Sequence, residues 1–156
     1  MDKLIDDLIK LAFAEDIGDG DHTTLCCIPE TAMGKSQLII KEDGVLAGVE
    51  MAKRIFHDFD PELKMTVFIQ DGAEVKKGDI AFVVEGKIQS LLQTERLMLN
   101  VMQRMSGIAT TTRKYAKALE GTKTHVLDTR KTTPGMRMID SGDALQRLLQ
   151  KMLNFR

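Results

Sequence analysis

The stretch that decides the fold runs from Thr94 to Gly135 and reads TERLMLNVMQRMSGIATTTRKYAKALEGTKTHVLDTRKTTPG. Its first half spaces apolar residues three and four apart, which predicts a long amphipathic helix with one buried stripe. Thr94 is expected to be the N-cap, and Gly121 the residue that ends the helix. The expected stripe consists of Met98, Val101, Met102, Met105, Ile108 and Ala109.

Three residues or pairs stand out on this predicted helix. Ser106-Gly107 interrupts it at a cost of about 1 kcal/mol relative to alanine, and a glycine there is typical of a bend or a close approach. Taken alone, Arg96 and Arg104 are interpreted as surface arginines. Arg96 gains interest because it lies where the helix is expected to begin, and helix N-termini favour anions.

A polar run follows the helix. Residues 124–127 predict a short strand, after which six polar residues (128–133) lead into a Pro134-Gly135 turn. Arg130 offers a planar fork suited to carboxylates, and Lys131 a point charge suited to phosphates. Successive strand residues point to opposite faces, so both would reach one ligand only from an irregular strand end. An anion site and a solvated loop both remain open from this chemistry.

The residues before the stretch predict helices and short strands. Pro61 and several Asp-Gly turns separate these elements. Residues 1 to about 92 therefore predict an α+β unit with a mostly antiparallel sheet. The expected helices are 2–15 and 48–59, and the expected strands are 37–41 and 45–47 around a turn at 42–44, then 63–70 and 80–85.

We interpret three other sets of polar residues as structural or surface residues and not as functional sites. Asp19, Asp21 and His22 lack the spacing of a calcium loop, so 15–24 is expected to be a solvated, self-capping loop. His57 is expected at the surface. The pair Lys76-Lys77 resembles a lipoyl- or biotinyl-carrier turn but lacks its apolar flanks, which favours a structural hairpin.

Composition excludes several classes of function. A net charge of −1 over 156 residues shows no excess of basic residues of the kind that nucleic-acid binding needs. No apolar run approaches the roughly 18 residues of a membrane span, and the start of the chain lacks a signal-peptide pattern. The adjacent Cys26 and Cys27 are interpreted as reduced thiols. These features indicate a cytoplasmic protein that binds neither nucleic acid nor membrane.

Five motifs, in order, resemble the quinolinate phosphoribosyltransferase family, also called nicotinate-nucleotide pyrophosphorylase (carboxylating). DTRKTTPGMR and the preceding TERLMLNVMQRMSGIAT carry most of the resemblance. It covers residues 3 to about 140, and the molybdenum-transport relative called ModD is a near alternative that shares part of the pattern. The three earlier motifs are EDIGDGDHTT (15–24), KEDGVLAG (41–48) and DGAEVKKGDIAFVVEG (71–86).

The resemblance implies an α+β chain in which an α/β sandwich domain is followed by an incomplete α/β barrel. Residues 1–120 would form the N-terminal sandwich with its mostly antiparallel sheet and the long helix. Residues 121–140 would begin the barrel domain and supply only its first strand. Residues 141–156 form a predicted helical tail outside the family pattern.

The resemblance also implies a reaction in NAD biosynthesis. Quinolinate and phosphoribosyl pyrophosphate, with Mg²⁺, would give nicotinate mononucleotide, pyrophosphate and carbon dioxide. Arg130 and Lys131 would be catalytic, with Arg130 holding quinolinate, Lys131 holding phosphoribosyl pyrophosphate and Thr129 lining the same pocket. Arg96 would bind a quinolinate carboxylate across a homodimer or higher oligomer. No metal ligand is expected from this chain.

After Asp140 the family pattern stops, so we expect a truncated chain that is inactive alone. A non-catalytic dimerisation or ligand-binding domain with the same sandwich core remains the competing hypothesis. In either case the chain is expected to be at least a dimer, formed through the methionine-rich helix and the sheet.

Overall fold

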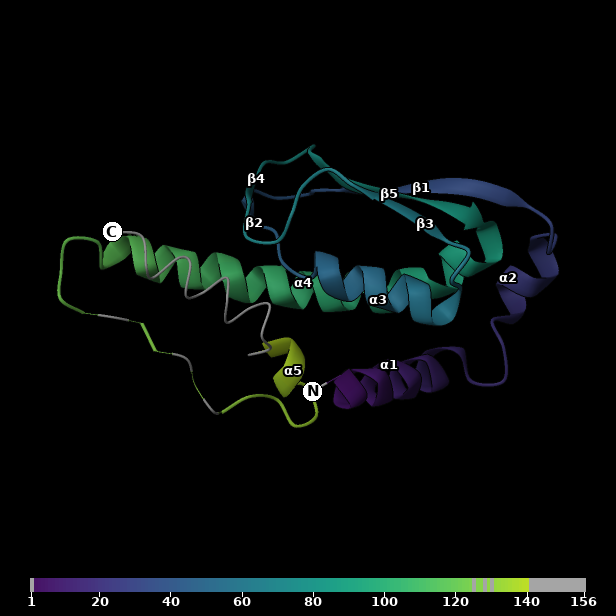
Figure 1. The fold of residues 1–156 in the computed structure, drawn as a ribbon, viewed down its shortest axis with the longest axis horizontal. Coiled ribbons are helices and arrows are strands. Elements are labelled where there is room, and N and C mark those ends of the chain that lie inside the picture. Colours follow the sequence, from purple (N-terminus) through teal and green to yellow (C-terminus); the bar gives the residue numbers. More distant parts are fainter. Residues whose placement is uncertain (1, 125, 128, 130, 141–156) are drawn as a thin grey trace.

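The computed structural model describes residues 2–124, 126–127, 129 and 131–140 (Figure 1). The helices within these residues are α1 (Asp2–Ile17), α2 (His22–Cys27), α3 (Val49–Phe59), α4 (Ile88–Ala118) and α5 (Arg137–Asp140). The strands are β1 (Met33–Ile39), β2 (Gly44–Val45), β3 (Lys64–Val67), β4 (Glu74–Val75) and β5 (Ile80–Lys87). The α+β class and the antiparallel sheet predicted from the sequence are confirmed.

The main sheet has the order β1-β5-β3, with both pairs antiparallel. The small β2-β4 sheet is also antiparallel. The strands on either side of the 42–44 turn therefore pair with later strands and not with each other. The turn is instead anchored by Asp43, whose carboxylate accepts the backbone N–H of Lys77 and the Nζ of Lys76, both at 2.9 Å.

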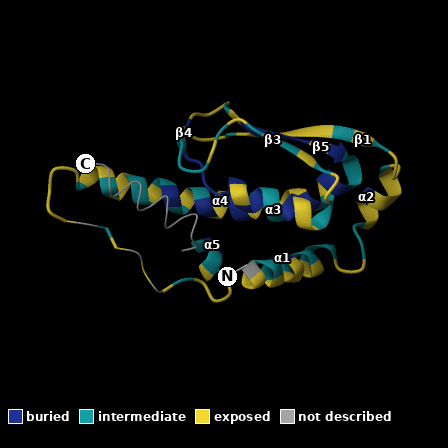
Figure 2. Cartoon of the chain, in the orientation of Figure 1, coloured by how far each residue is buried: buried dark blue, intermediate teal, exposed yellow. Residues whose placement is uncertain are grey.

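The hydrophobic core lies where the sheet packs on α3 and α4. Figure 2 shows the buried residues concentrated where these two helices meet β5. The rings of Phe56 and Phe82 meet edge to face with centroids 6.3 Å apart, which joins α3 to the central strand. The predicted stripe of α4 is confirmed, with Ile108 partly buried and the other five members buried. Its methionines, Met98, Met102 and Met105, are buried in the core of their own chain, and the dimer contact expected through this helix stays a prediction.

Helix α4 begins at Ile88, so the prediction of Thr94 as its N-cap is wrong. Thr94 is fully buried, and its hydroxyl donates to the carbonyl oxygens of Ser90 (2.7 Å) and Leu91 (3.1 Å). The helix starts early because the chain passes directly from β5 into it, and the Ile88 N–H bonds to the Ala32 carbonyl. The local pattern could not show this tertiary anchor.

Two hydroxyls of α4 fasten the segment around β2. Ser106 Oγ accepts the N–H of Ala47 at 3.0 Å, and Thr110 Oγ1 accepts the N–H of Val45 at 2.9 Å. By contrast, α4 runs unbroken through Gly107, where an added Cβ would meet nothing within 4 Å. The close approach predicted at Gly107 is therefore wrong, and Ser106 makes the contact.

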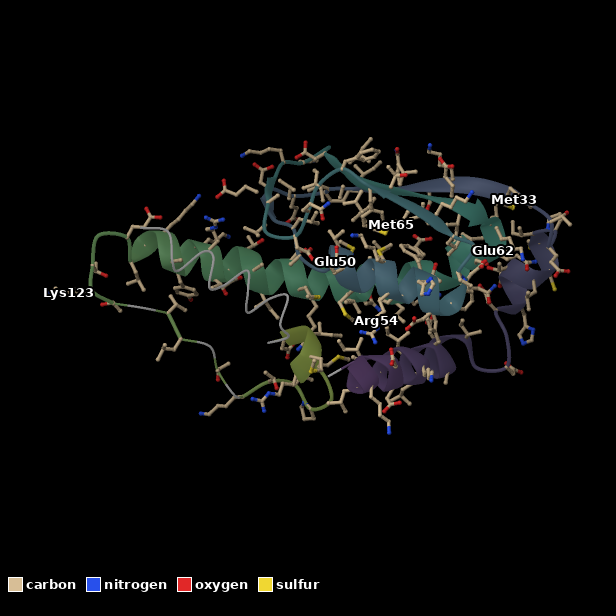
Figure 3. All side chains as sticks on the ribbon, viewed as in Figure 1. Met33, Glu50, Arg54, Glu62, Met65 and Lys123 are labelled. Carbon is tan, nitrogen blue, oxygen red and sulfur yellow. The ribbon has the colours of Figure 1, made fainter. Side chains whose placement is uncertain are left out.

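Helix α1 covers the side of α3 and α4 that faces away from the sheet (Figure 1). Arg54 of α3 pairs with Asp6 of α1 at 2.5 Å, and Figure 3 shows Arg54 between the two helices. The rings of Phe13 and Phe59 lie 4.9 Å apart. The predicted 15–24 loop is shorter than expected, because α1 continues to Ile17 and α2 begins at His22.

The segment after α4 departs most from expectation. Gly121 has φ +79°, as expected of a residue that ends a helix, although α4 itself stops at Ala118. Residues 124, 126 and 127 form no strand, and Leu127 is 86% exposed. A strand needs a hydrogen-bonding neighbour, and neither sheet among the described residues includes this segment. The predicted helix over 141–156 lies outside the described residues.

Candidate functional site

A cleft of about 680 Å³ opens between α1, α4 and α5, on the face of the helices opposite the sheet. Its floor is apolar and includes Val101 and Ile139, while Arg96 and Arg104 of α4 stand on its rim with two acids of α1. The two arginines are eight residues apart, which is about 12 Å along a helix. An apolar cleft with a few charged groups on its rim is a common form of ligand site.

Arg96 is an exposed cation on this rim. Its Nη1 lies 2.5 Å from Oδ1 of Asp16, yet the Arg96 side chain is 71% exposed and that of Asp16 only 24%. The hydrogen bond to Asp16 raises the pKa of Arg96 above its ordinary value. Because α4 begins at Ile88, Arg96 lies about two turns inside the helix. The expectation that a helix N-terminus assists Arg96 is therefore wrong.

Arg104 differs from Arg96 because its guanidinium group is bound at two nitrogens by residues of the same chain. Its Nε and Nη2 bind the two carboxylate oxygens of Asp140 at 2.5 and 2.9 Å, and Nη2 also donates to Thr133 Oγ1 at 2.6 Å. These hydrogen bonds hold the pKa of Asp140 below its ordinary range. The sequence carries no local signal for this pair, whose members are 36 residues apart. Sequence reasoning treated Arg104 only as a surface arginine.

The predicted residues of the polar run lie elsewhere. Thr129 and Lys131 are both exposed, and the N–H of Lys131 donates to Thr129 Oγ1 at 3.1 Å. Neither residue lines the cleft that Arg96 borders. Arg130 lies outside the described residues. A single chain thus places Arg96 in the cleft but not Thr129 and Lys131.

The other candidate residues have structural roles. Asp21 caps α2 by accepting the N–H of Thr24 at 3.1 Å and its hydroxyl at 2.5 Å, which lowers the pKa of Asp21. His57 is exposed, as predicted. In the described part of the chain, no three His, Cys, Asp or Glu side chains come together as a metal site. None of the described helices combines the length and apolar character that crossing a membrane requires.

An antiparallel sheet layered on two helices, with an arginine-rimmed cleft on the far side, defines an α+β sandwich. The sequence profile of the quinolinate phosphoribosyl transferase N-terminal domain matches residues 21–106, and the profile of the C-terminal domain matches residues 108–145. The first match alone spans more than half of the 156 residues. The chain therefore belongs to the quinolinate phosphoribosyl transferase family.

Individual relatives agree with this membership. Quinolinate phosphoribosyltransferase (decarboxylating) 1 of Nicotiana glauca is 46% identical over 134 residues, which are 85% of this chain and 38% of the relative. The chloroplastic nicotinate-nucleotide pyrophosphorylase (carboxylating) of Oryza sativa subsp. japonica is 45% identical over 134 residues, 85% of this chain and 36% of the relative. Neither of these relatives carries the name of a ModD protein.

The fold agrees as well. The crystal structure of NadC from Streptococcus pyogenes matches with a TM-score of 0.88 and 36% identity, over 94% of this chain and 52% of that chain. The resemblance inferred from the five motifs is thus confirmed. The chain spans about 38% of the length of the two Nicotiana relatives that are 46% identical to it, so it corresponds to part of those proteins.

Proposed function

We propose that this chain contributes the sandwich part of an enzyme that transfers a phosphoribosyl group to quinolinate. The products would be nicotinate mononucleotide, pyrophosphate and carbon dioxide. The observation that carries the proposal is the exposed guanidinium of Arg96 on the rim of the 680 Å³ cleft. A guanidinium fork suits a dicarboxylate, and this one can exchange its partner Asp16 for a ligand carboxylate.

The polar run after α4 would supply the remaining contacts. Arg130 would hold a quinolinate carboxylate, Lys131 would bind the phosphates, and Thr129 would line the same pocket. These fixed cations would stabilise the developing charge of the leaving pyrophosphate and the carbanion left on the ring carbon when carbon dioxide departs. Mg²⁺ would arrive with phosphoribosyl pyrophosphate, because Mg²⁺ usually binds through substrate phosphates and retained waters.

The two halves of this site are proposed to meet between chains. Arg96 borders a cleft that Thr129 and Lys131 do not line, so Arg96 would serve a neighbouring copy in a homodimer or higher oligomer. Sedimentation at micromolar concentration should show at least a dimer, and a monomer would contradict this arrangement. A cytoplasmic location is part of the proposal, although the rice relative is named chloroplastic.

A non-catalytic ligand-binding or dimerisation domain is the second candidate. It is favoured by the described residues, in which Thr129 and Lys131 do not line the cleft that Arg96 borders. If the first candidate is right, these 156 residues should bind quinolinate and form no product alone, because they span about 38% of the relatives.

Turnover and binding separate the two candidates. The purified chain is incubated with quinolinate, phosphoribosyl pyrophosphate and Mg²⁺, and nicotinate mononucleotide is sought by mass spectrometry while calorimetry measures binding. Binding without product supports a sandwich part that needs further residues. Product that disappears in Arg130→Ala would show that the chain is sufficient, and a folded chain that binds neither substrate would favour the second candidate.

A further inference from the structure

Arg104 joins α4 to the segment that follows the polar run. The guanidinium binds both oxygens of Asp140, the last residue of α5, and also the hydroxyl of Thr133. Asp140 in turn accepts the backbone N–H of Thr133 through Oδ2 at 3.1 Å. Three residues from two distant parts of the sequence therefore form one closed set of hydrogen bonds, in which Thr133 takes part through both its hydroxyl and its backbone N–H.

This set is part of a compact unit. The N–H groups of Met136 and Asp140 bond to the carbonyls of Thr133 and Met136 at 2.9 and 2.8 Å, which closes the turn and the short helix. Ile139 is buried against the core and keeps the unit on α4. The end of the polar run, at Thr133, is thereby fixed to a helix that is itself anchored in the core.

We infer that Arg104 is a positioning residue that holds the end of the polar run, from Lys131 to Thr133, in place and does not itself bind the ligand. Thr133 lies two residues beyond Lys131, whose own N–H is bonded to Thr129. A segment tied at Thr133 can present Lys131 with less conformational freedom to lose when a ligand binds. The ligand depends on the proposed function, whereas the tie to α4 does not.

The charge of Arg104 supports this assignment. The Asp140 side chain that neutralises it is only 10% exposed, and both of its oxygens bind the guanidinium. Arg96 pairs through one nitrogen and remains 71% exposed. A bidentate, partly buried pair is harder to exchange for a ligand than a single exposed contact.

Asp140→Asn separates the two roles that Arg104 could play, because the substitution preserves shape and removes the neutralising charge. If Arg104 were a ligand cation, this variant would leave binding unchanged or strengthen it. If Arg104 acts through Asp140, the variant should weaken binding just as Arg104→Ala does. Arg113→Ala is the matched control, since Arg113 is another arginine of α4 and lies near Glu74, with Nη1 3.9 Å from Oε1.

Amide hydrogen exchange of the 156-residue chain provides the direct measurement. We expect Arg104→Ala and Asp140→Asn each to speed exchange of the Thr133 amide by about tenfold, the loss expected for one charge-assisted hydrogen bond. The Lys131 amide should also exchange faster, while the Met102 amide within α4 reports that the fold is intact. Calorimetry should show weaker binding of phosphoribosyl pyrophosphate in both variants and no change in Arg113→Ala.

Two results would overturn the inference. One is an unchanged Thr133 exchange rate in both variants, which would show that the hydrogen bonds do not fix the segment. The other is tighter binding in Asp140→Asn together with weaker binding in Arg104→Ala, which would make Arg104 a ligand contact. If the unaltered chain binds neither quinolinate nor phosphoribosyl pyrophosphate, the proposed function fails and the exchange rates alone decide the role of Arg104.

Discussion

Asp71 caps helix α3 from outside the helix: its Oδ1 accepts the backbone N–H of Val49 at 2.8 Å, across 22 residues of sequence. Its other oxygen accepts the N–H of Glu50 at 3.3 Å. The residue at the N-cap position is Gly48, which has no side chain to cap the helix. The turn that follows β3 therefore stabilises the first turn of α3.

Removing this cap should destabilise the fold. We expect Asp71→Ala to lower the free energy of unfolding by about 1–2 kcal/mol, because two helix N–H groups lose their acceptor. Asp71→Asn should cost less, since it keeps one acceptor and removes a charge that burial disfavours. Urea unfolding measures both, with the exposed Asp58→Ala on the same helix as control. Wild-type stability in Asp71→Ala would show that the cap contributes nothing.

Two glycine substitutions should change the stability of the fold in opposite directions. Gly48 has φ +102°, and an added Cβ would lie 3.2 Å from Cγ of Met102 and 3.3 Å from its Cα. Gly48→Ala should therefore lower stability by about 1–3 kcal/mol. Gly107→Ala, inside α4 with open space around it, should raise stability by up to about 1 kcal/mol. Thermal unfolding of the pair checks the signs, and equal effects would contradict both assignments.

The Arg104–Asp140 pair should make stability depend on acidity. Because hydrogen bonds from Arg104 lower the pKa of Asp140 in the folded chain, the unfolded chain binds a proton more readily. The stabilisation is therefore complete well above the ordinary Asp pKa of about 3.9 and is lost as the pH falls through and below that value. The stability gap between the wild type and Asp140→Asn should narrow between pH 6 and pH 3.5 in urea unfolding.

Asp71 provides the internal control for that experiment. Burial raises the pKa of Asp71, so the folded chain binds this proton more readily than the unfolded chain does. Its contribution is greatest at low pH and is lost as the pH rises through the folded pKa. Relative to Asp71→Asn, the wild type should gain stability as the pH falls, whereas relative to Asp140→Asn it should lose stability. If both comparisons change in the same direction with pH, the pKa shift of Asp71 or that of Asp140 is contradicted.

Arg96 and Asp16 should have opposite effects on quinolinate binding. Arg96→Ala removes the fork proposed to bind a carboxylate, so affinity should fall about tenfold or more while stability is unchanged, because the side chain is exposed. Asp16→Asn removes the competing carboxylate and should leave affinity equal or higher. Calorimetry on the 156-residue chain tests both variants. Weaker binding in Asp16→Asn alone would show that the acid, and not Arg96, contacts the ligand.

Patterns that repeat along the chain were predicted correctly. The spacing of Met98, Met102 and Met105 identified the buried face of α4, because helix geometry converts a short local period into one face. The helix at Val49–Phe59 and its end before Pro61 follow from the same local rules. The family followed from motifs whose order the chain preserves.

Contacts between distant residues were decided only by the tertiary structure. The start of α4 at Ile88 depends on β5 and on the carbonyl of Ala32, and the caps and clamps formed by Asp71 and Asp140 join residues 22 and 36 positions apart. A single acid or arginine has the same local pattern whether it faces water or a partner. The sequence by itself therefore determined helix α3 and the buried face of α4. Packing determined which charged groups meet, because pairing energies depend on distances in space and not on spacing along the chain.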